Sequence, residues 1–501
     1  MKDLLPNITG QLSDALGSIR YFMPEIYLTA LFILVLVTDL LFGKNSLKLC
    51  RTVAAAGMLV IMFADYNQYF FLPKGSDAHY LFNGMLRLHN SSIIFKLIID
   101  LLTFLLLLYF TWDNRLKAHK KGLSDLYTIV VGSVLGLHLM IMAVNLLSVY
   151  LAIEFVSIAS YLLVAYRSEN AFSTEAGLKY VLFGAASSAV MLYGISLLYG
   201  YSGTLDLFGG HMAESLMQVN ALSVSFALVL VLAGIGFKLS FVPVHFWVPD
   251  VYEGAATPVT AYLSTLPKIA AFALLVNFVT PFVFLQGWKG FDFRLVLSAI
   301  GIATMIAGNF AAVLQTNVKR ILAYSGIGHT GFALMALVTF TQQGLSALAY
   351  YLLVYGMANI AALVLANYFE NTEGITDVKD YKGLGFKYPL ASVCFVVVLI
   401  SLTGIPISAG FTAKLFAFSA VYSVYEQGHD VWLLALLITG ALTTVVSLFY
   451  YIKVPLNLFL RRSELIVSEN KRSLSLVIFS TIIAVLLIIL GIFPDILIKY
   501  M

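Results

Sequence analysis

The stretch ALVLVLAGIGFKLSFVPVHFWVPDVYEGAATP, residues 227–258, decides the fold. It opens as a continuous apolar run, which is typical of a helix that crosses a lipid bilayer. Lys238 interrupts this run, and Pro243, Pro249 and Pro258 follow it. Because proline removes a backbone hydrogen-bond donor and kinks a helix, the sequence predicts a broken membrane helix that carries a buried charge.

The whole chain has the composition of an integral membrane protein. Of its 501 residues, 60% are hydrophobic and 11% are charged, against about 25% charged in an ordinary soluble domain. At ~20 apolar residues per span, this length holds about 12 to 15 membrane helices and leaves no room for a sizeable soluble domain. Cys50 and Cys394 both fall in apolar stretches and are interpreted as buried free thiols, too few for a metal or cluster site. The net charge of +4 gives no indication of nucleic-acid binding.

Apolar stretches bounded by charges, proline or glycine predict an all-α polytopic fold with about fourteen transmembrane helices. These stretches lie near residues 22–42, 50–72, 91–111, 125–144, 146–166, 174–200, 221–246, 258–286, 294–314, 317–340, 344–369, 388–424, 430–459 and 474–497. Prolines and glycines interrupt the stretches 221–246 and 388–424. We expect both of these to be broken helices.

Lysines and arginines in short loops predict the orientation, because they concentrate on the cytoplasmic side. They follow the first, third, ninth and thirteenth spans, and all fall on one side: Lys44, Lys48, Arg51, Arg115, Lys117, Lys120, Lys121, Lys319, Arg320, Lys453, Arg461 and Arg462. With an even number of spans, both termini are then expected on the non-cytoplasmic side.

An internal repeat divides the chain. The segment Ala233-Gly-Ile-Gly-Phe-Lys238 resembles Ala409-Gly-Phe-Thr-Ala-Lys414 at an offset of 176 residues, and the same offset carries Glu154 to Thr330. The repeating unit has five spans, so its second copy must be inverted in the membrane. We therefore expect an N-terminal three-helix segment at 1–120, five-helix repeats at 121–290 and 291–460, and a C-terminal helix at 461–501.

Seven ionisable residues inside the predicted spans are candidates for function, because a charge there costs roughly 2.5–3.5 kcal/mol on insertion scales. They are Glu154, Lys179, Lys238, His245, Lys268, His329 and Lys414. A lysine near a helix end can reach the headgroups instead, and this alternative is most open for Lys179. For Glu154 the alternative is a structural ion pair that only locks two helices. An acid and several bases in separate helices favour proton binding, because movement of Glu154 relative to Lys238 would switch the lysine between charged and neutral forms.

One apparent motif is set aside. Gly326-Ile-Gly328-His-Thr-Gly331 matches the dinucleotide-binding pattern GxGxxG, yet no predicted strand precedes it. We interpret these glycines as small residues at a helix–helix contact.

Two groups of residues carry a family resemblance. The first group is Gly236-Phe-Lys238 with Pro243-Val-His245-Phe-Trp247-Val-Pro249-Asp250-Val-Tyr-Glu253. The second group is Ser401-Leu-Thr-Gly404-Ile-Pro406 with Gly410-Phe and Lys414. Both groups resemble the proton-pumping, antiporter-like membrane subunits of respiratory complex I, the NADH–quinone oxidoreductase. They also resemble the related Mrp-type cation/proton antiporter subunits. The resemblance extends over essentially the whole chain and implies fourteen helices with two inverted five-helix repeats.

The resemblance implies roles for the buried residues. Glu154 and Lys238 would form the proton pair of the first half, Lys268 the central relay and Lys414 the gate of the second half. Lys179, His245 and His329 would support them. The chain would hold no redox centre, with NADH, FMN, iron–sulfur clusters and quinone bound by partner subunits.

The implied setting is a bacterial inner membrane, beside other membrane subunits of the complex that include further antiporter-like ones. Two alternatives stay open: a subunit of an Mrp-type antiporter, and a structural membrane scaffold whose charges only pair helices. The deep lysines argue against a scaffold, because apolar or small residues would serve packing better.

Overall fold

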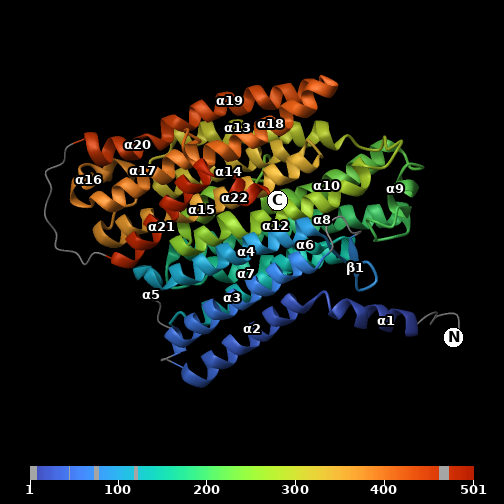
Figure 1. Ribbon diagram of the computed structural model, residues 1–501, viewed down its shortest axis with the longest axis horizontal. Coiled ribbons are helices and arrows are strands. Elements are labelled where there is room, and N and C mark those ends of the chain that lie inside the picture. The colour runs from blue at the N-terminus through green and yellow to red at the C-terminus, as the bar shows by residue number, and fades with distance from the viewer. Residues whose placement is uncertain (1–7, 44–45, 73–77, 118–121, 462–472) are drawn as a thin grey trace.

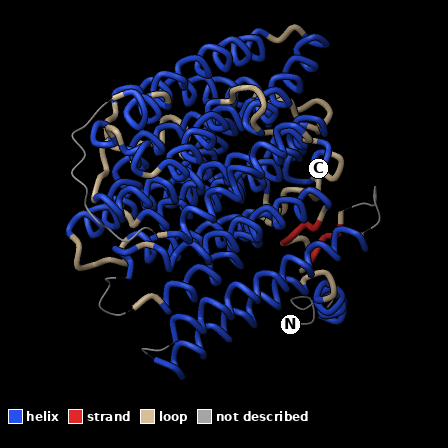
Figure 2. The backbone as a smooth tube through the Cα atoms, turned by 60° about the vertical axis from the view of Figure 1, so that its left-hand side comes forward, coloured by secondary structure: helices blue, strands red, loops and turns tan. Residues whose placement is uncertain are grey.

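The computed structural model describes residues 8–43, 46–72, 78–117, 122–461 and 473–501. Within this part of the chain the fold is a bundle of helices with one short β-hairpin (Figure 2). The all-α polytopic prediction is confirmed. Of the basic residues that predict the orientation, Lys44, Lys120, Lys121 and Arg462 lie outside the described residues.

The helices follow the predicted apolar stretches closely. Those that belong to predicted spans are α2 (Met23–Phe42), α3 (Ser46–Phe71), α4 (Asn90–Tyr109), α6 (Ser124–Met142), α7 (Leu146–Val164), α8 (Ala171–Ser202), α10 (Ala221–Leu239), α12 (Thr257–Val283), α13 (Phe293–Leu314), α14 (Val318–Leu337), α15 (Gln342–Glu373), α17 (Pro389–Thr403), α18 (Ala409–Gly428), α19 (Val431–Tyr451) and α21 (Leu474–Ile492).

Shorter elements connect these helices. They are α1 (Ile8–Ile19), the strands β1 (His79–Leu81) and β2 (Leu86–Leu88), the 3-10 turn η3 (Phe110–Trp112), α5 (Asn114–Lys117), α9 (His211–Leu216), α11 (Val248–Gly254), η4 (Val378–Tyr381), α16 (Leu384–Lys387), α20 (Lys453–Pro455), the π-helical turn η5 (Leu456–Leu460) and α22 (Asp495–Ile498). The strands pair antiparallel, with His79 opposite Leu88.

Twelve helices in the described part of the chain are long and apolar enough to cross a membrane. Helix α14 and the discontinuous pair α17–α18 fall outside that set and correspond to the predicted spans 317–340 and 388–424. The total of about fourteen spans therefore stays a prediction, as do the four segment boundaries. Polar residues in α14 and the short length of α17 explain why these predicted spans are not among the twelve apolar helices.

Both predicted helix breaks are present. Helix α10 ends at Leu239, where Ser240 takes a left-handed conformation with φ of 61°, and α11 begins only at Val248. Helix α17 ends at Thr403, followed by Gly404 with φ of 85°, a conformation that glycine adopts without steric cost. Residues on either side of each break place carbonyl groups inside the bundle, where side chains can bind them.

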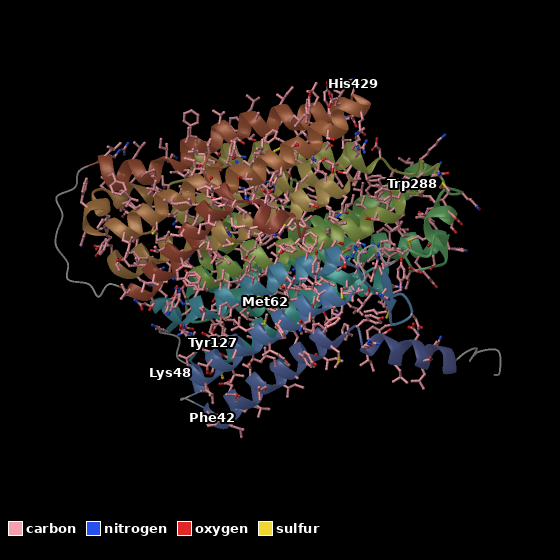
Figure 3. The ribbon with its side chains drawn as sticks, viewed as in Figure 1. Phe42, Lys48, Met62, Tyr127, Trp288 and His429 are labelled. Atoms are coloured by element: carbon pink, nitrogen blue, oxygen red, sulfur yellow. The ribbon has the colours of Figure 1, made fainter. Side chains whose placement is uncertain are left out.

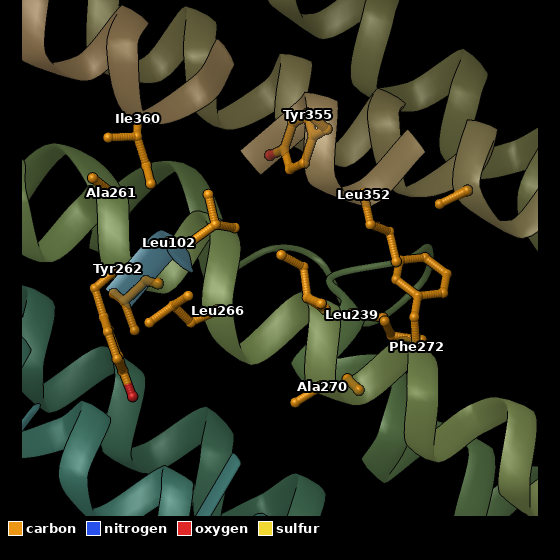
Figure 4. Packing of buried hydrophobic residues seen from close by; sticks show 14 of the residues in the cluster. Leu102, Leu239, Ala261, Tyr262, Leu266, Ala270, Phe272, Leu352, Tyr355 and Ile360 are labelled. Carbon is orange, nitrogen blue, oxygen red and sulfur yellow. The ribbon is translucent and has the colours of Figure 1, made fainter. Parts of the chain in front are cut away.

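Helices α12 and α15 form the interior of the bundle. In Figure 1 they run through the middle of the molecule, with α2 and α3 along the lower edge and α19 along the upper edge. Figure 4 shows apolar side chains that pack around α12, among them Leu102, Leu239, Phe272 and Leu352. The apolar part of α15 is buried all round, as expected for a helix with no polar face.

The edge helices keep apolar side chains exposed. Phe42 at the lower edge of Figure 3 is 56% exposed, and Leu40 and Leu41 beside it are each 75% exposed. Such a surface is suited to lipid or to neighbouring membrane proteins.

The two chain ends share one end of the bundle. The Tyr69 hydroxyl donates to the Tyr500 carbonyl oxygen at 2.8 Å, and the neighbouring Gln68 donates to the Tyr21 carbonyl oxygen at 2.7 Å. An even number of crossings produces this arrangement. That this end faces away from the cytoplasm remains a prediction.

Candidate functional site

Three lysines from different helices are buried in the centre of the bundle. Lys238 lies in the last turn of α10, Lys268 in the middle of α12 and Lys414 in α18. Their exposed fractions are 3%, 2% and 5%. Buried lysines are rare in any protein and costly inside a membrane, so these positions are candidates for function.

Lys238 is surrounded by aromatic rings. Its Nζ lies 5.6 to 5.8 Å from the ring centroids of Tyr161, Tyr180 and Phe237. In the described part of the chain, this Nζ has no hydrogen-bond partner. The amine is therefore held by ring faces alone, which attract its charged form but offer it no hydrogen bond.

Glu154 lies on α7, partly buried, and accepts a short hydrogen bond from the Ser188 hydroxyl of α8. No ion pair within 4.0 Å connects Glu154 to Lys238 among the described residues. The structural ion pair considered from the sequence is thus not formed as a direct contact. A switch between these two residues would have to act over a longer distance.

Lys268 connects the two halves of the chain. Its Nζ donates to the Gly326 carbonyl oxygen at 3.1 Å and to the Thr330 hydroxyl at 3.4 Å, both on α14. The Thr330 hydroxyl also lies 3.0 Å from the carbonyl oxygen of Leu239, the residue after Lys238. A short polar path therefore runs from the broken end of α10 to the central lysine.

His329 continues this path. Its Nδ1 lies 2.7 Å from the Tyr351 hydroxyl, its Nε2 lies 3.3 Å from the Tyr451 hydroxyl, and its ring lies 4.9 Å from that of Tyr355. The Tyr451 hydroxyl makes a short hydrogen bond with Ser325. The histidine thus has a hydroxyl at each ring nitrogen, so a proton could enter at one side and leave at the other.

Lys414 is held by the second helix break. Its Nζ donates to the Thr403 carbonyl oxygen at 2.8 Å and to the Thr444 hydroxyl at 3.4 Å, and lies 4.5 Å from the centroid of the Phe332 ring. Thr403 is the last residue of α17, so its carbonyl is one that the break leaves without a helical partner. Unlike Lys238, this amine is hydrogen-bonded.

Lys179 lies apart from the buried lysines, at the surface. It contacts Glu175 at 2.9 Å and Asp250 at 2.8 Å, and Asp250 and Glu253 both bind Arg320 of α14, at 3.0 and 2.8 Å. Partial burial opposes ionisation of Asp250, but hydrogen bonds from Lys179 and Arg320 outweigh it and lower the pKa of this carboxyl group. This surface network joins α8, α11 and α14.

His245 lies in the break between α10 and α11. Its ring lies 4.4 Å from that of Phe246, which is 69% exposed. The Nδ1 atom is buried and has no hydrogen-bond partner among the described residues. Its placement beside the break leaves it near the surface rather than in the series of buried lysines.

The glycines of the apparent nucleotide motif serve helix packing, as predicted. They lie in α14, and a Cβ added to Gly331 would fall 2.8 Å from the Gly301 carbonyl oxygen of α13. A Cβ on Gly326 would fall 2.9 Å from the Tyr355 hydroxyl. These small residues allow α14 to approach both its neighbour and Lys268.

Five charged residues that the sequence analysis did not select are also fully buried, in the first four membrane helices. They are Glu25, Asp65, Lys96, Asp100 and His138. Each lies within a predicted apolar stretch, and the four-residue spacing of Lys96 and Asp100 on one helix face was the available signal.

A metal is not assigned to these residues. Donor atoms of Asp65, Asp100 and His138 lie within 4.8 Å of one another, close enough for one metal ion. Lys96 already places an ammonium 2.6 Å from Asp65 and therefore supplies the positive charge there.

Comparison with known proteins agrees with this geometry. The family described as NADH:quinone oxidoreductase/Mrp antiporter, TM matches residues 143–444. The NADH-quinone oxidoreductase subunit N 2 of Chloroherpeton thalassium is 38% identical over 466 residues, which cover 91% of this chain and 89% of that protein. A chain of the respiratory complex I from Thermus thermophilus with bound aureothin superposes with a TM-score of 0.76 at 27% identity, covering 95% of this chain and 98% of that chain.

A chain of the Mrp complex from Dietzia sp. shares the fold alone, with a TM-score of 0.79 at 21% identity over 95% of each chain. The family match spans α7 to α18 and includes Glu154, Lys238, Lys268 and Lys414. The chain belongs to the NADH:quinone oxidoreductase/Mrp antiporter family of transmembrane proteins.

Proposed function

We propose that this chain is a proton-translocating membrane subunit of an NADH–quinone oxidoreductase, of the subunit N type. The observation that carries the proposal is the series Lys238, Lys268 and Lys414, buried on three helices within the family-matched residues. The Thr330 hydroxyl lies between the first two, and His329 lies beside Thr330 on α14. Buried amines that differ in hydrogen bonding can hold protons with different affinity, which directed transfer requires.

In this proposal the chain supplies no redox chemistry. Oxidation of NADH and reduction of quinone, with the FMN and iron–sulfur clusters that they need, belong to partner subunits. Conformational or electrostatic change in those partners would first act on Glu154 and Lys238. The charge of the other buried lysines would change after that. The partners include other membrane subunits of the complex in a bacterial inner membrane.

The relatives favour this function over that of an Mrp-type antiporter. The similar proteins at 36% to 38% identity carry NADH-quinone or NAD(P)H-quinone oxidoreductase names, whereas the Mrp likeness is one of fold. Purification of the chain from its own membrane separates the two functions. Flavin and iron–sulfur subunits should copurify with it; copurification of small membrane proteins alone would support the antiporter.

The role of the lysines is tested in the assembled complex by Lys238→Ala and Lys414→Ala. Each variant should assemble normally and lose NADH-driven proton uptake into proteoliposomes. Lys289→Ala is the matched control, because Lys289 is exposed on a loop. Pumping at the parental rate by either fully assembled variant would exclude the assigned role.

A further inference from the structure

A second group of charges is buried outside the family-matched residues. Glu25 of α2, Asp65 of α3, Lys96 and Asp100 of α4 and His138 of α6 are all fully buried. The four helices pack against one another at the lower side of the bundle in Figure 1. None of these residues belongs to the series that contains Lys238, Lys268 and Lys414.

The Lys96 ammonium lies against three oxygen atoms. It forms ion pairs with Glu25 Oε1 at 2.7 Å and Asp65 Oδ1 at 2.6 Å, and it donates a hydrogen bond to Gln68 Oε1 at 3.2 Å. Gln68 donates its amide to the Tyr21 carbonyl oxygen, which fixes its oxygen toward Lys96. Lys96 is therefore a cation held between two carboxylates and an amide oxygen.

His138 lies between two carboxylates. Its Nδ1 is 3.2 Å from Glu25 Oε1 and its Nε2 is 3.1 Å from Asp100 Oδ1. A neutral imidazole has one donor and one acceptor, and an ionised carboxylate can only accept. Both contacts can be hydrogen bonds only if the imidazole is doubly protonated or one of the carboxyl groups carries a proton. The geometry thus requires one proton beyond those of the Lys96 ammonium and of a neutral imidazole.

The charges do not balance without a further proton. Three carboxylates face one ammonium and, at most, one imidazolium, which leaves an excess negative charge in a closed, fully buried site. In the described part of the chain, Glu25 Oε2, both carboxylate oxygens of Asp65 and Asp100 Oδ2 have no hydrogen-bond partner, although Asp65 Oδ1 is ion-paired with Lys96. Oxygen atoms of Asp65 and Asp100 also lie within 4.8 Å of each other. Two buried carboxylates this close do not both stay ionised without compensation, and a shared proton supplies it.

We propose that Asp65, Asp100 and His138, together with Glu25, form a second proton-binding site that holds one exchangeable proton on a carboxyl group. Gln68 connects the site to its surroundings: it is one turn from Asp65 on α3, partly exposed, and in contact with Lys96. Gln68 therefore lies between the site and the end of the bundle that carries Tyr21 and Tyr500. This inference does not depend on the roles proposed for the buried lysines.

A purely structural ion cluster would be built differently. Equal numbers of positive and negative groups would lock the four helices without orphaned oxygens, and each orphaned buried oxygen costs about 1–3 kcal/mol. A metal ion in place of the proton is disfavoured, because it would share the site with an ammonium that already lies 2.6 Å from Asp65. One proton removes the excess negative charge and reduces the number of unpartnered oxygens.

The test counts protonated carboxyl groups by infrared spectroscopy of the intact complex during a pH change, in water and in D₂O. The parent should show a carboxylic C=O band from this site that shifts in D₂O. Asp65→Asn or Asp100→Asn removes one negative charge, so the band should be lost. Lys96→Met removes one positive charge, so the band should double. Asp39→Asn is the matched control on α2, where Asp39 pairs with Ser46 outside the cluster, and it should leave the band unchanged.

The infrared band should disappear in the Asn variants and double in Lys96→Met, and a purely structural cluster would show neither change. A band that is the same in Asp65→Asn, Asp100→Asn and the parent would overturn the proposal, as would a tightly bound metal that these variants lose. If the Asn variants do not assemble, Asp65→Glu keeps the carboxyl group in a shifted position. It should change the band frequency, and an unchanged frequency would also overturn the proposal. The band is read without NADH, so loss or retention of pumping in the lysine variants does not affect the outcome.

Discussion

Replacing Lys238 by methionine should stabilise the folded protein while it abolishes proton pumping. The amine is buried at 3% exposure and has no hydrogen-bond partner among the described residues. Removing this cation from the buried interior recovers roughly 2.5–3.5 kcal/mol, the insertion-scale value for a charge at mid-membrane. Three ring contacts near the ~6 Å limit are lost, together about 1–2 kcal/mol. The difference favours the variant by about 0.5–2.5 kcal/mol.

Lys238→Met should be stabilising whether the lysine is charged or neutral, because a buried neutral amine without a hydrogen-bond partner also costs about 1–3 kcal/mol. For a chain of this size, we expect the melting temperature of the assembled complex to rise by about 1–4 °C. Scanning fluorimetry measures this shift, and NADH-driven acidification of proteoliposomes measures pumping.

Lys414→Met is the matched comparison. This lysine donates to the Thr403 carbonyl oxygen and to the Thr444 hydroxyl, so its removal orphans a buried carbonyl. We expect a loss of about 1–3 kcal/mol and a lower melting temperature, again with loss of pumping. Equal destabilisation by Lys238→Met and Lys414→Met would refute the reasoning, because it would mean that Lys238 has polar partners in the folded protein.

Three further predictions concern other parts of the bundle. Glu154→Gln should reduce pumping far more than Glu154→Asp, because only the former removes the charge; equal activity of the two would exclude a charge switch. Gly331→Ala should destabilise the complex by about 1–3 kcal/mol in thermal unfolding, because its Cβ would fall 2.8 Å from the Gly301 carbonyl oxygen, whereas Gly200→Ala, with open space around it, should change stability by less than about 1 kcal/mol. Because the pKa of Asp250 is lowered in the folded protein, its ionised carboxylate stabilises the fold at pH values above the ordinary carboxyl pKa of 3.8. This stabilisation is lost as the pH falls through the lower pKa of the folded protein. Hydrogen exchange of α11 should therefore accelerate in that acid range, and Asp250→Asn should remove this dependence.

Much of the fold follows from the sequence because the membrane leaves few choices. Apolar length predicts the helices, and Pro243 and the Gly404-Ile-Pro406 run predict the two breaks. The exact ends depend on single residues in left-handed conformations, Ser240 and Gly404, of which only the glycine has a clear signal. Helix α14 was predicted as a span although its polar residues lower its hydropathy.

Contacts between side chains of different helices could be predicted less well, because no sequence pattern shows which helices pack side by side. The proton pair of Glu154 and Lys238 stays a prediction; the direct contacts in the structure are a serine for Glu154 and a set of rings for Lys238. Glu25 and His138 are 113 residues apart and come together only through packing of α2 on α6.

The Thr330 hydroxyl can switch between two hydrogen bonds. It carries one hydrogen but lies within reach of two carbonyl oxygens, that of Leu239 at 3.0 Å and that of Gly326 at 3.1 Å. It can donate to only one of them at a time. When it turns to Leu239, it ties the broken end of α10 to α14. When it turns to Gly326, it shares that carbonyl with the Lys268 amine and leaves the end of α10 free. Rotation of one bond therefore attaches or releases the end of the helix that carries Lys238.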